Sequence, residues 1–280
     1  MRALFLALAL GCWADGAQAQ SMRPFGTFRQ LHGETRLSAR VEYAAGALHL
    51  APGRPTDLYR MNVSYDEDRF VPVSGFDAAR AEVVLGVRPA GEGGLRVVSR
   101  QQLRQVASVA FSPRVDLTLD VALGAVDADL ELGGLRLSSL SLETGASRAV
   151  VRFSQPNRTR CRTAEFSAGA ADLSVLGLGN ARCDRIAFEG GVGKVTLDFG
   201  GVWSSSSRVG VRMAVGELTL RIPRRVGVSI TLDRFLATFD PAGLVRRGGG
   251  FASANYDRAE RHLDIEVATA VGGVRVEWSE

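Results

Sequence analysis

One apolar pattern recurs along most of the chain. It can be aligned on seven anchor residues, which are 21, 24, 22, 23, 21 and 35 positions apart. The residue two positions before each anchor and the residue seven positions after it are apolar in every copy. The position nine after the anchor is also apolar, except at Pro241, so each unit contains two short strands of alternating pattern. The anchors are Val121, Leu142, Phe166, Phe188, Val211, Leu232 and Val267.

Small residues separate the two strands of each unit. Glycine or alanine stands three positions after most anchors, as at Gly124 and Ala214, and often again two positions later, as at Gly216. Small residues allow a tight corner at this point. A unit of about 22 residues cannot bury its apolar face alone, but stacked copies build a continuous core. The pattern therefore predicts an all-β fold, a stacked, β-solenoid-like repeat of about seven units. The alternative is an antiparallel sandwich, which has no reason to keep one register over seven units.

The register extends once into the N-terminal part and is then lost. A further copy is centred on Val41, but residues 52–110 contain strand-like stretches at 61–65, 82–87 and 95–98 that do not follow the repeat. Charged and glycine-rich turns separate these stretches. We therefore predict a smaller N-terminal β-module over residues 21–110 and the repeat domain over residues 111–280.

The first twenty residues have the features of a secretory signal peptide. A basic start at Arg2 precedes an apolar run, and Ala17-Gln18-Ala19 forms a small-residue cleavage site before Gln20. We expect export to the periplasm or the outside of the cell. Lipid anchoring at Cys12 is the alternative, although the residues before it fit a lipoprotein signal poorly. No other stretch reaches the ~18 apolar residues of a membrane-spanning helix, so no transmembrane segment is expected in the mature chain.

Composition bears on partners and on disulfide formation. The net charge of +4 is too small to indicate nucleic-acid binding. Cys161 and Cys183 are the two cysteines left after removal of the signal peptide, and each lies five positions before an anchor. Neighbouring strands of a sheet are ~4.8 Å apart, which suits a disulfide. We predict this disulfide, worth about 3 kcal/mol for a 22-residue loop, over the alternative of two free thiols.

Two groups of arginines are candidate binding residues. The repeat register places Arg160 beside Arg182 and Arg185 beside Arg208, which would form a strip able to hold phosphate or carboxylate groups of an anionic envelope polymer. We favour a solvated face over such a site, since charges also protect strand edges. Arg246 and Arg247 precede a glycine triplet in the longest step, and we interpret this loop as a flexible connection rather than a binding loop.

The sequence offers no recognisable catalytic or metal site. His32, His49 and His262 lack metal-ligand spacing. Four aspartates between residues 116 and 129 suggest calcium, but they alternate with apolar residues as outward-facing positions should. Carboxylates in a groove would be needed for polysaccharide cleavage, and the acidic residues of the repeat are scattered. We predict neither a cofactor nor enzymatic activity.

Several stretches resemble a known family. Residues 41–50, 57–59 and 62–66 resemble the N-terminal module of bacterial toast-rack proteins, and residues 211–228 resemble the repeated sheet of the same group. Relatives include the LiaF-like proteins of the cell-wall-active-antibiotics response, in which a similar C-terminal domain follows membrane helices and restrains an envelope-stress sensor kinase. This chain lacks such helices, and the resemblance implies no catalytic or metal residues.

These observations predict a non-enzymatic, extracytoplasmic binding or scaffold protein of the bacterial cell envelope. A link to envelope stress is implied by the resemblance alone. The expected partner is an envelope protein or an anionic envelope polymer. One alternative is a carbohydrate-active enzyme on a solenoid scaffold. Another is a self-assembling, adhesin-like structural protein that associates through an open terminal rung near Val271 to Trp278.

Overall fold

The computed structural model describes residues 21–91 and 104–279. The predicted signal peptide, Cys12 and the strand-like stretch at 95–98 lie outside these residues. The described chain forms a single sheet of 16 strands, with two short helical segments, α1 (Leu178–Ala181) and η2 (Tyr256–Arg258). The strands are β1 (Met22–Gln30), β2 (Arg36–Pro52), β3 (Asp57–Asp66), β4 (Phe70–Asp77), β5 (Glu82–Pro89), β6 (Val106–Phe111), β7 (Asp116–Glu131), β8 (Leu137–Thr144), β9 (Arg148–Arg152), β10 (Cys161–Leu176), β11 (Cys183–Asp198), β12 (Ser207–Pro223), β13 (Gly227–Asp240), β14 (Val245–Arg247), β15 (Gly250–Ala252) and β16 (His262–Ser279).

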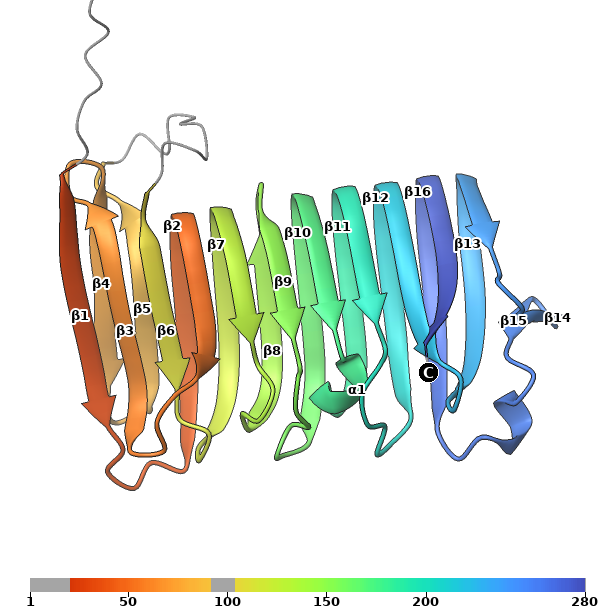
Figure 1. Ribbon diagram of the computed structural model, residues 1–280, viewed down its shortest axis with the longest axis horizontal. Helices are drawn as coiled ribbons and strands as arrows, with labels where there is room; N and C mark the ends of the chain where they lie inside the picture. Colours follow the sequence, from red (N-terminus) through yellow and green to blue (C-terminus); the bar gives the residue numbers. More distant parts are fainter. Residues whose placement is uncertain (1–20, 92–103, 280) are drawn as a thin grey trace, which may run out of the picture.

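The predicted repeat is confirmed, together with its register. Long parallel strands stand side by side along the molecule (Figure 1), in the order β2, β7, β8 with β9, β10, β11, β12, β16 and β13. From Val121 to Val211 each anchor is the direct lateral neighbour of the next: Val121 pairs with Leu142, and Phe166 pairs with Phe188. The anchor Val267 pairs with both Val211 and Leu232. We call each of these long strands a rung, with β8 and β9 forming one rung together. The fold is therefore an all-β stack of rungs.

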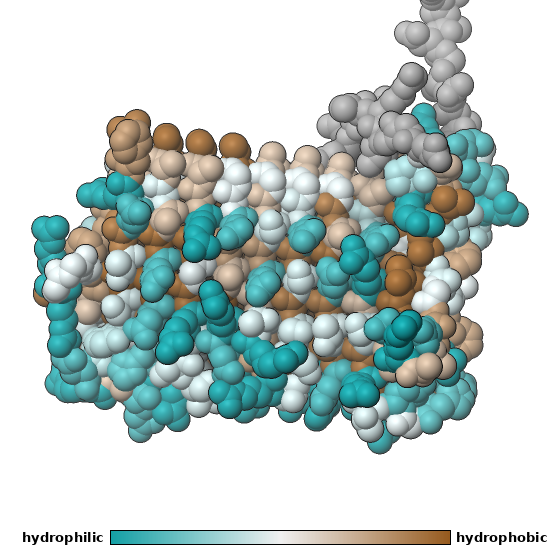
Figure 2. Space-filling model, turned by 180° about the vertical axis from the view of Figure 1, so that it is seen from behind, coloured by the Kyte–Doolittle hydropathy of each residue, from teal (hydrophilic) through white to brown (hydrophobic). Residues whose placement is uncertain are grey.

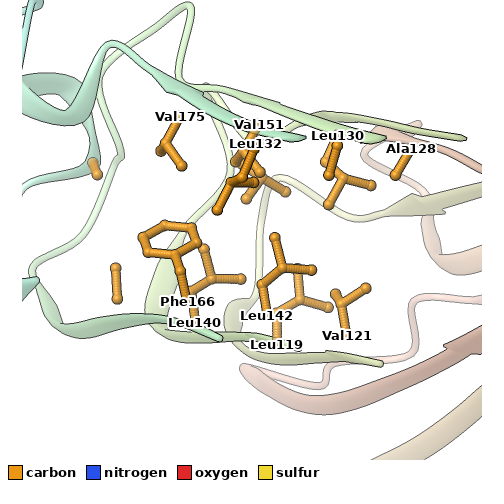
Figure 3. Close-up of a cluster of buried hydrophobic side chains, with 14 of the residues drawn as sticks. Leu119, Val121, Ala128, Leu130, Leu132, Leu140, Leu142, Val151, Phe166 and Val175 are labelled. Atoms are coloured by element: carbon orange, nitrogen blue, oxygen red, sulfur yellow. The ribbon is translucent and has the colours of Figure 1, made fainter. Parts of the chain in front are cut away.

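The core lies between the two halves of the rungs. Each rung bends at its corner, so that its first and second halves face one another. Figure 3 shows the result: Leu119 and Val121 project from one wall toward Ala128 and Leu130 on the other. All four side chains are at most 5% exposed. Because every rung contributes the same inward positions, the core runs continuously along the stack.

Glycine is required at several corners. Gly193, Gly216 and Gly272 are lateral neighbours with φ of 151°, 139° and 129°. Residues that carry a side chain rarely adopt this backbone conformation. A Cβ atom at Gly216 would lie 1.9 Å from the carbonyl oxygen of Gly193. Backbone therefore packs directly on backbone from rung to rung, which explains the small residues that recur in the sequence.

The spatial order of the last rungs differs from the chain order. β16 lies between β12 and β13, pairing with both in parallel, so β13 is the last long strand of the stack. The prediction of an open terminal rung near Val271 to Trp278 is therefore wrong. All rungs carry the same apolar pattern, so the pattern cannot say which two are neighbours. Residues 241–261 carry the chain past β13 before it returns as β16.

At the opposite end of the stack, shorter strands flank β2, and the outermost of them are antiparallel. β2 is a full rung, in which Val41 pairs with Val121 of β7. Its other edge pairs with β5 along one half and with β6 along the other. β3 continues from β6, β1 from β3, and β4 from β5, all antiparallel. The sheet thus continues without a break across residue 110, and the division into two domains stays a prediction.

Candidate functional site

Exposed apolar side chains are aligned along the corners of the C-terminal rungs. Val192, Val215, Val271 and Leu236 are successive lateral neighbours on β11, β12, β16 and β13. They are 57%, 41%, 41% and 66% exposed, and Phe235 beside Leu236 is 80% exposed. Figure 2 shows a row of apolar side chains along the upper edge of the molecule, toward the β13 end. We call these five residues the apolar ridge.

The apolar ridge concentrates an unusual share of the exposed apolar surface. It contains five of the ten large hydrophobic residues that are exposed in the described part of the chain. Single exposed hydrophobic residues are ordinary, whereas a contiguous row makes this edge a candidate binding surface. At the other end of the stack the equivalent corner positions are the smaller Ala45 and Ala125. Corner side chains therefore become larger toward β13.

A shallow groove of about 750 Å³ runs beside the apolar ridge. It exists because the corner positions next to the ridge are small, at Gly169, Gly191, Ala214 and Ala270, which leaves backbone where side chains would otherwise stand. A second groove of about 580 Å³ lies over the β2 and β7 corners. Tyr43 lines it, with a buried hydroxyl that has no hydrogen-bond partner, and burial raises the pKa of that phenol above its ordinary value.

Two pairs of opposite charges lie beside the apolar ridge on β11 and β12. Arg212 binds Glu189 on the neighbouring rung at 3.0 Å, and Lys194 binds Glu217 at 3.5 Å. Both pairs are well exposed and contribute little stability. Their effect is to leave the margin of the apolar ridge polar and close to neutral. This surface suits an uncharged, apolar partner better than an anionic polymer.

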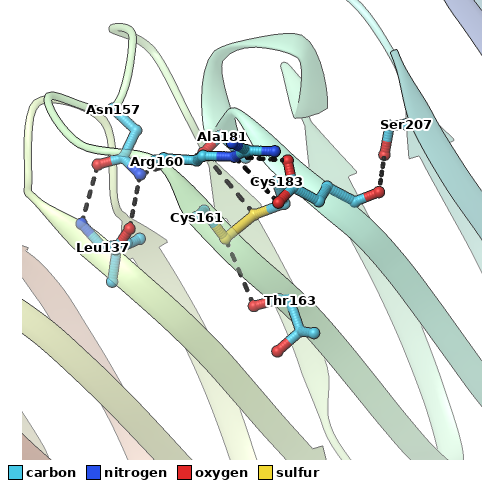
Figure 4. Close-up of a disulfide and its surroundings, with 9 residues drawn as sticks. Leu137, Asn157, Arg160, Cys161, Thr163, Ala181, Cys183 and Ser207 are labelled. Atoms are coloured by element: carbon cyan, nitrogen blue, oxygen red, sulfur yellow. Dashed lines mark hydrogen bonds and ion pairs between the residues drawn. A yellow bond between two sulfur atoms is a disulfide. The ribbon is translucent and has the colours of Figure 1, made fainter. Parts of the chain in front are cut away.

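The predicted disulfide is present. Cys161 of β10 and Cys183 of β11 are lateral neighbours, with Cα atoms 4.2 Å apart and a bond between their sulfur atoms. Both residues are buried. Figure 4 shows the bond across two adjacent rungs, with Arg160 above it. The disulfide is thus a covalent link between rungs in the interior of the stack.

A buried asparagine near the disulfide was missed by sequence reasoning. Asn157 accepts a hydrogen bond from the Leu137 backbone N–H at 2.8 Å and donates to the carbonyl oxygens of Leu137 and Ala181 at 2.8 and 3.2 Å (Figure 4). Its amide therefore joins the loops of neighbouring rungs. Asn180 has the same role one rung further, between Phe153 and Val202. Asn157 lies in a loop and Asn180 in the short helix α1, where the alternation of apolar residues gives no signal.

The four arginines of the predicted strip have different surroundings. Arg185 and Arg208 are exposed lateral neighbours on β11 and β12. Arg160 instead binds the carboxylate of Asp184 at 3.0 Å. The Arg182 guanidinium donates to the Ser204 hydroxyl and to the Asn157 carbonyl. Two of the four charges thus already have partners, and anion binding by the strip stays a prediction.

The loop between β13 and β16 forms a small hairpin. Arg247 of β14 makes two hydrogen bonds to the carboxylate of Asp257, which raises the pKa of this guanidinium above its ordinary value. The guanidinium of Arg246 lies 6.0 Å from the ring centre of Phe251, which packs against Phe239. These contacts fold the glycine-rich segment against the end of the stack. The interpretation of this segment as a connection rather than a binding loop stays a prediction.

The residues considered for catalysis or calcium do not converge. Asp116, Asp120 and Asp129 each bind an arginine on a neighbouring rung, as outward-facing positions in a sheet can. Within residues 21–91 and 104–279, no group of three or more His, Cys, Asp or Glu side chains is arranged to hold a metal ion. Neither helical segment among the described residues has the length and apolar character needed to cross a membrane.

Comparisons with known proteins place the chain in a family. A protein from Clostridium sporogenes ATCC 15579, described as a candidate cell adhesion protein, is 15% identical with a TM-score of 0.47, over 92% of this chain and 100% of that one. A candidate adhesin from Bacteroides fragilis NCTC 9343 is 7% identical with a TM-score of 0.41, over 91% and 97%. Likenesses at these TM-scores carry no inference about function, and no curated protein matches the chain. The model of the N-terminal domain of toast_rack, DUF2154, matches residues 18–176, more than half of the 280 residues, and the chain therefore belongs to the toast-rack family.

Proposed function

We propose that this protein is a non-enzymatic scaffold of the bacterial cell envelope that binds an apolar surface of another envelope protein through its apolar ridge. The observation that carries the proposal is the alignment of Val192, Val215, Val271 and Leu236 on consecutive rungs. A rigid row of apolar side chains with a neutral margin supplies contact area and costs little conformational entropy on binding.

Export is part of the proposal. The buried disulfide between Cys161 and Cys183 supports a compartment in which disulfides persist, such as the periplasm or the cell exterior. The cleavage-site pattern at residues 17–20 points the same way. The absence of enzymatic activity and the connection with envelope stress belong to the same proposal, the latter on family resemblance.

The proposal can be tested by crosslinking in intact cells. A photoreactive phenylalanine analogue is placed at Val215, on the apolar ridge, and as a matched control at Arg162, an exposed outward position of β10. We expect a discrete crosslinked product from position 215 and none from position 162. Mass spectrometry of the product identifies the partner.

A second arm separates specific binding from capture by proximity. The combined change of Val192, Val215 and Val271 to Ser removes the aliphatic row from exposed positions, so the fold should be retained. Crosslinking from Leu236 should then fall about tenfold or more, as expected for loss of more than 1.4 kcal/mol of binding energy. Equal products from positions 215 and 162, or crosslinking unaffected by the triple change, would remove the support for the apolar ridge as the binding surface.

A further inference from the structure

The last long strand of the stack has an open edge. β13 pairs with β16 from Gly227 to Asp240, but on its other side only Ser229 and Ile230 pair with β15. In the part of the chain that the structure describes, residues 231–240 have no strand beside them on that side. Apart from the Ala237 carbonyl, which accepts a hydrogen bond from Arg234, their N–H and C=O groups on that side form a template on which another strand can pair.

This edge has few of the devices that usually prevent strand addition: Asp233 and Arg234 are charged, and the Arg234 guanidinium donates a hydrogen bond to the Ala237 carbonyl. β13 contains no proline, and its exposed large hydrophobic residues are Phe235 and Leu236, at 80% and 66%. The edge strand at the other end, β1, contains Pro24, and the guanidinium of Arg60 covers the ring of its exposed Phe28 at 4.5 Å. Proline and charged groups at an edge oppose pairing with another chain. The two ends of the sheet are therefore protected unequally.

The open edge also exposes the end of the core. Leu232 and Phe239 occupy inward positions of the repeat but are only half-buried. Their lateral neighbours on β16, Val267 and Val274, are each 2% exposed. A strand added beyond β13 would complete the burial of the inward residues of this rung, at about 25 cal/mol for each Å² of apolar surface removed from water.

We propose that the open edge of β13 pairs with the same edge of a second copy of this chain, antiparallel, about a two-fold axis at the corner. The bend of the rung carries the argument, because an added strand must bend at the same place. The β13 strand of a second copy bends at the same place as the first when the two-fold axis passes through Phe235 or through Leu236. These two residues are also the midpoint of the free stretch 231–240, so the two edges match in length.

Charge and symmetry agree with this register. An axis at Phe235 or Leu236 sets an apolar residue against its own copy, so no charged residue lies opposite itself. Like charges directly opposite each other would be destabilising. When the β13 edge pairs with the β13 edge of a second copy, both open edges are used, so the assembly stops at a dimer and does not grow into a fibre. The β14–β15 hairpin beside Ser229 and Ile230 would flank the paired segment symmetrically in both copies.

The experiment uses the mature chain from residue 21. Sedimentation velocity over a concentration series should show a monomer–dimer equilibrium. Phe235→Asp places two like charges at the axis and should weaken the dimer about tenfold or more. The melting temperature of the monomer, measured at the lowest concentration of the series, should be unchanged because this side chain is exposed in the monomer. Under mild oxidation Phe235→Cys should form a covalent dimer. Val202→Cys, 58% exposed and far from the edge, should not.

The outcomes also distinguish this inference from the proposed function, on which it does not depend. A monomer at every concentration would overturn the β13 dimer and leave the apolar ridge to be judged by its own crosslinks. A dimer that resists Phe235→Asp but is crosslinked through Val192→Cys would show association through the apolar ridge instead. If the Phe235→Cys variant forms a disulfide with a different envelope protein and no homodimer, the proposed second copy is wrong. The strand that pairs with β13 then belongs to that other protein.

Discussion

The rungs β12 and β13 carry the same sequence pattern in different surroundings. β12 lies between β11 and β16, whereas β13 has a full neighbour on one side only. The corner of β12 requires glycine at Gly216, while β13 has Ala237 at the equivalent position. The inward Leu218 of β12 is 1% exposed, while its counterpart Phe239 is half-buried. The missing neighbour explains the exposure of Phe239, whereas the two corners differ in backbone conformation, since φ is 139° at Gly216 and is not positive at Ala237.

The corner should show the largest difference between the two rungs. Gly216→Ala forces an alanine into φ of 139° and brings its Cβ against the Gly193 carbonyl, so we expect a loss on the order of 4 kcal/mol. Ala237→Gly in β13 should cost about 1 kcal/mol or less. Urea unfolding measures both. Gly210→Ala is the control within β12, because an added Cβ there meets no atom within 4 Å. Similar losses at 216 and 210 would refute the packing of backbone on backbone.

The same truncation in the core should be more costly inside the stack than at its end. Leu218→Ala leaves a cavity between two neighbouring rungs and should destabilise the protein by about 3 kcal/mol. Leu232→Ala in β13 removes a side chain that is already half-exposed, so we expect about 1 kcal/mol. Thermal and chemical unfolding of the two variants provides the comparison. A loss at Leu232 as large as that at Leu218 would mean that β13 is already covered in solution.

The disulfide links two interior rungs and has no counterpart at β13 in the described chain. Replacing Cys161 and Cys183 together by alanine should lower stability by about 3 kcal/mol, mainly through the entropy of the unfolded chain. A non-reducing peptide map of protein purified from the envelope should show the two residues linked. Free thiols in that map would contradict both the proposed export and the bond between β10 and β11.

Outward positions should show the smallest difference. Arg212 of β12 is paired with Glu189 on the exposed face, and Arg234 of β13 donates to the Ala237 carbonyl at the open end. Replacing either by alanine should change stability by less than about 0.5 kcal/mol, because exposed ion pairs contribute little. Differential scanning calorimetry at low and high salt measures this. A larger loss at Arg234 alone would show that the open edge depends on charge.

The sequence was most informative where the repeat places equivalent residues side by side. Aligning the anchors predicted the pairing of Phe166 with Phe188 and of Cys161 with Cys183, because each rung presents the same positions to its neighbour. The order of β16 and β13 could not be obtained in this way, since both strands fit either place. Asn157 also gave no signal, because it lies in a loop outside the repeated pattern and its three hydrogen bonds go to backbone groups.

The apolar ridge left a signal in the sequence that was not recognised. Val192, Val215 and Val271 each stand between two small residues at the corner, outside the alternation that marks inward positions. A branched side chain at a tight corner cannot turn inward without displacing the backbone of the next rung. Such residues must therefore point outward, and a repeated one marks a surface rather than the core.

The insertion of β16 between β12 and β13 makes folding of the C-terminal end a competition between two strands. β13 precedes β16 in the chain and carries the same apolar pattern, so it can pair with β12 first and occupy the place that β16 holds in the native sheet. The native order then requires this premature pairing to open, or the final strand to arrive before β13 docks. Long-range parallel pairing is slow to form and prone to kinetic traps. A truncation that removes β16 would leave β13 with β12 as its best remaining neighbour and would produce a shorter, wrongly ordered stack.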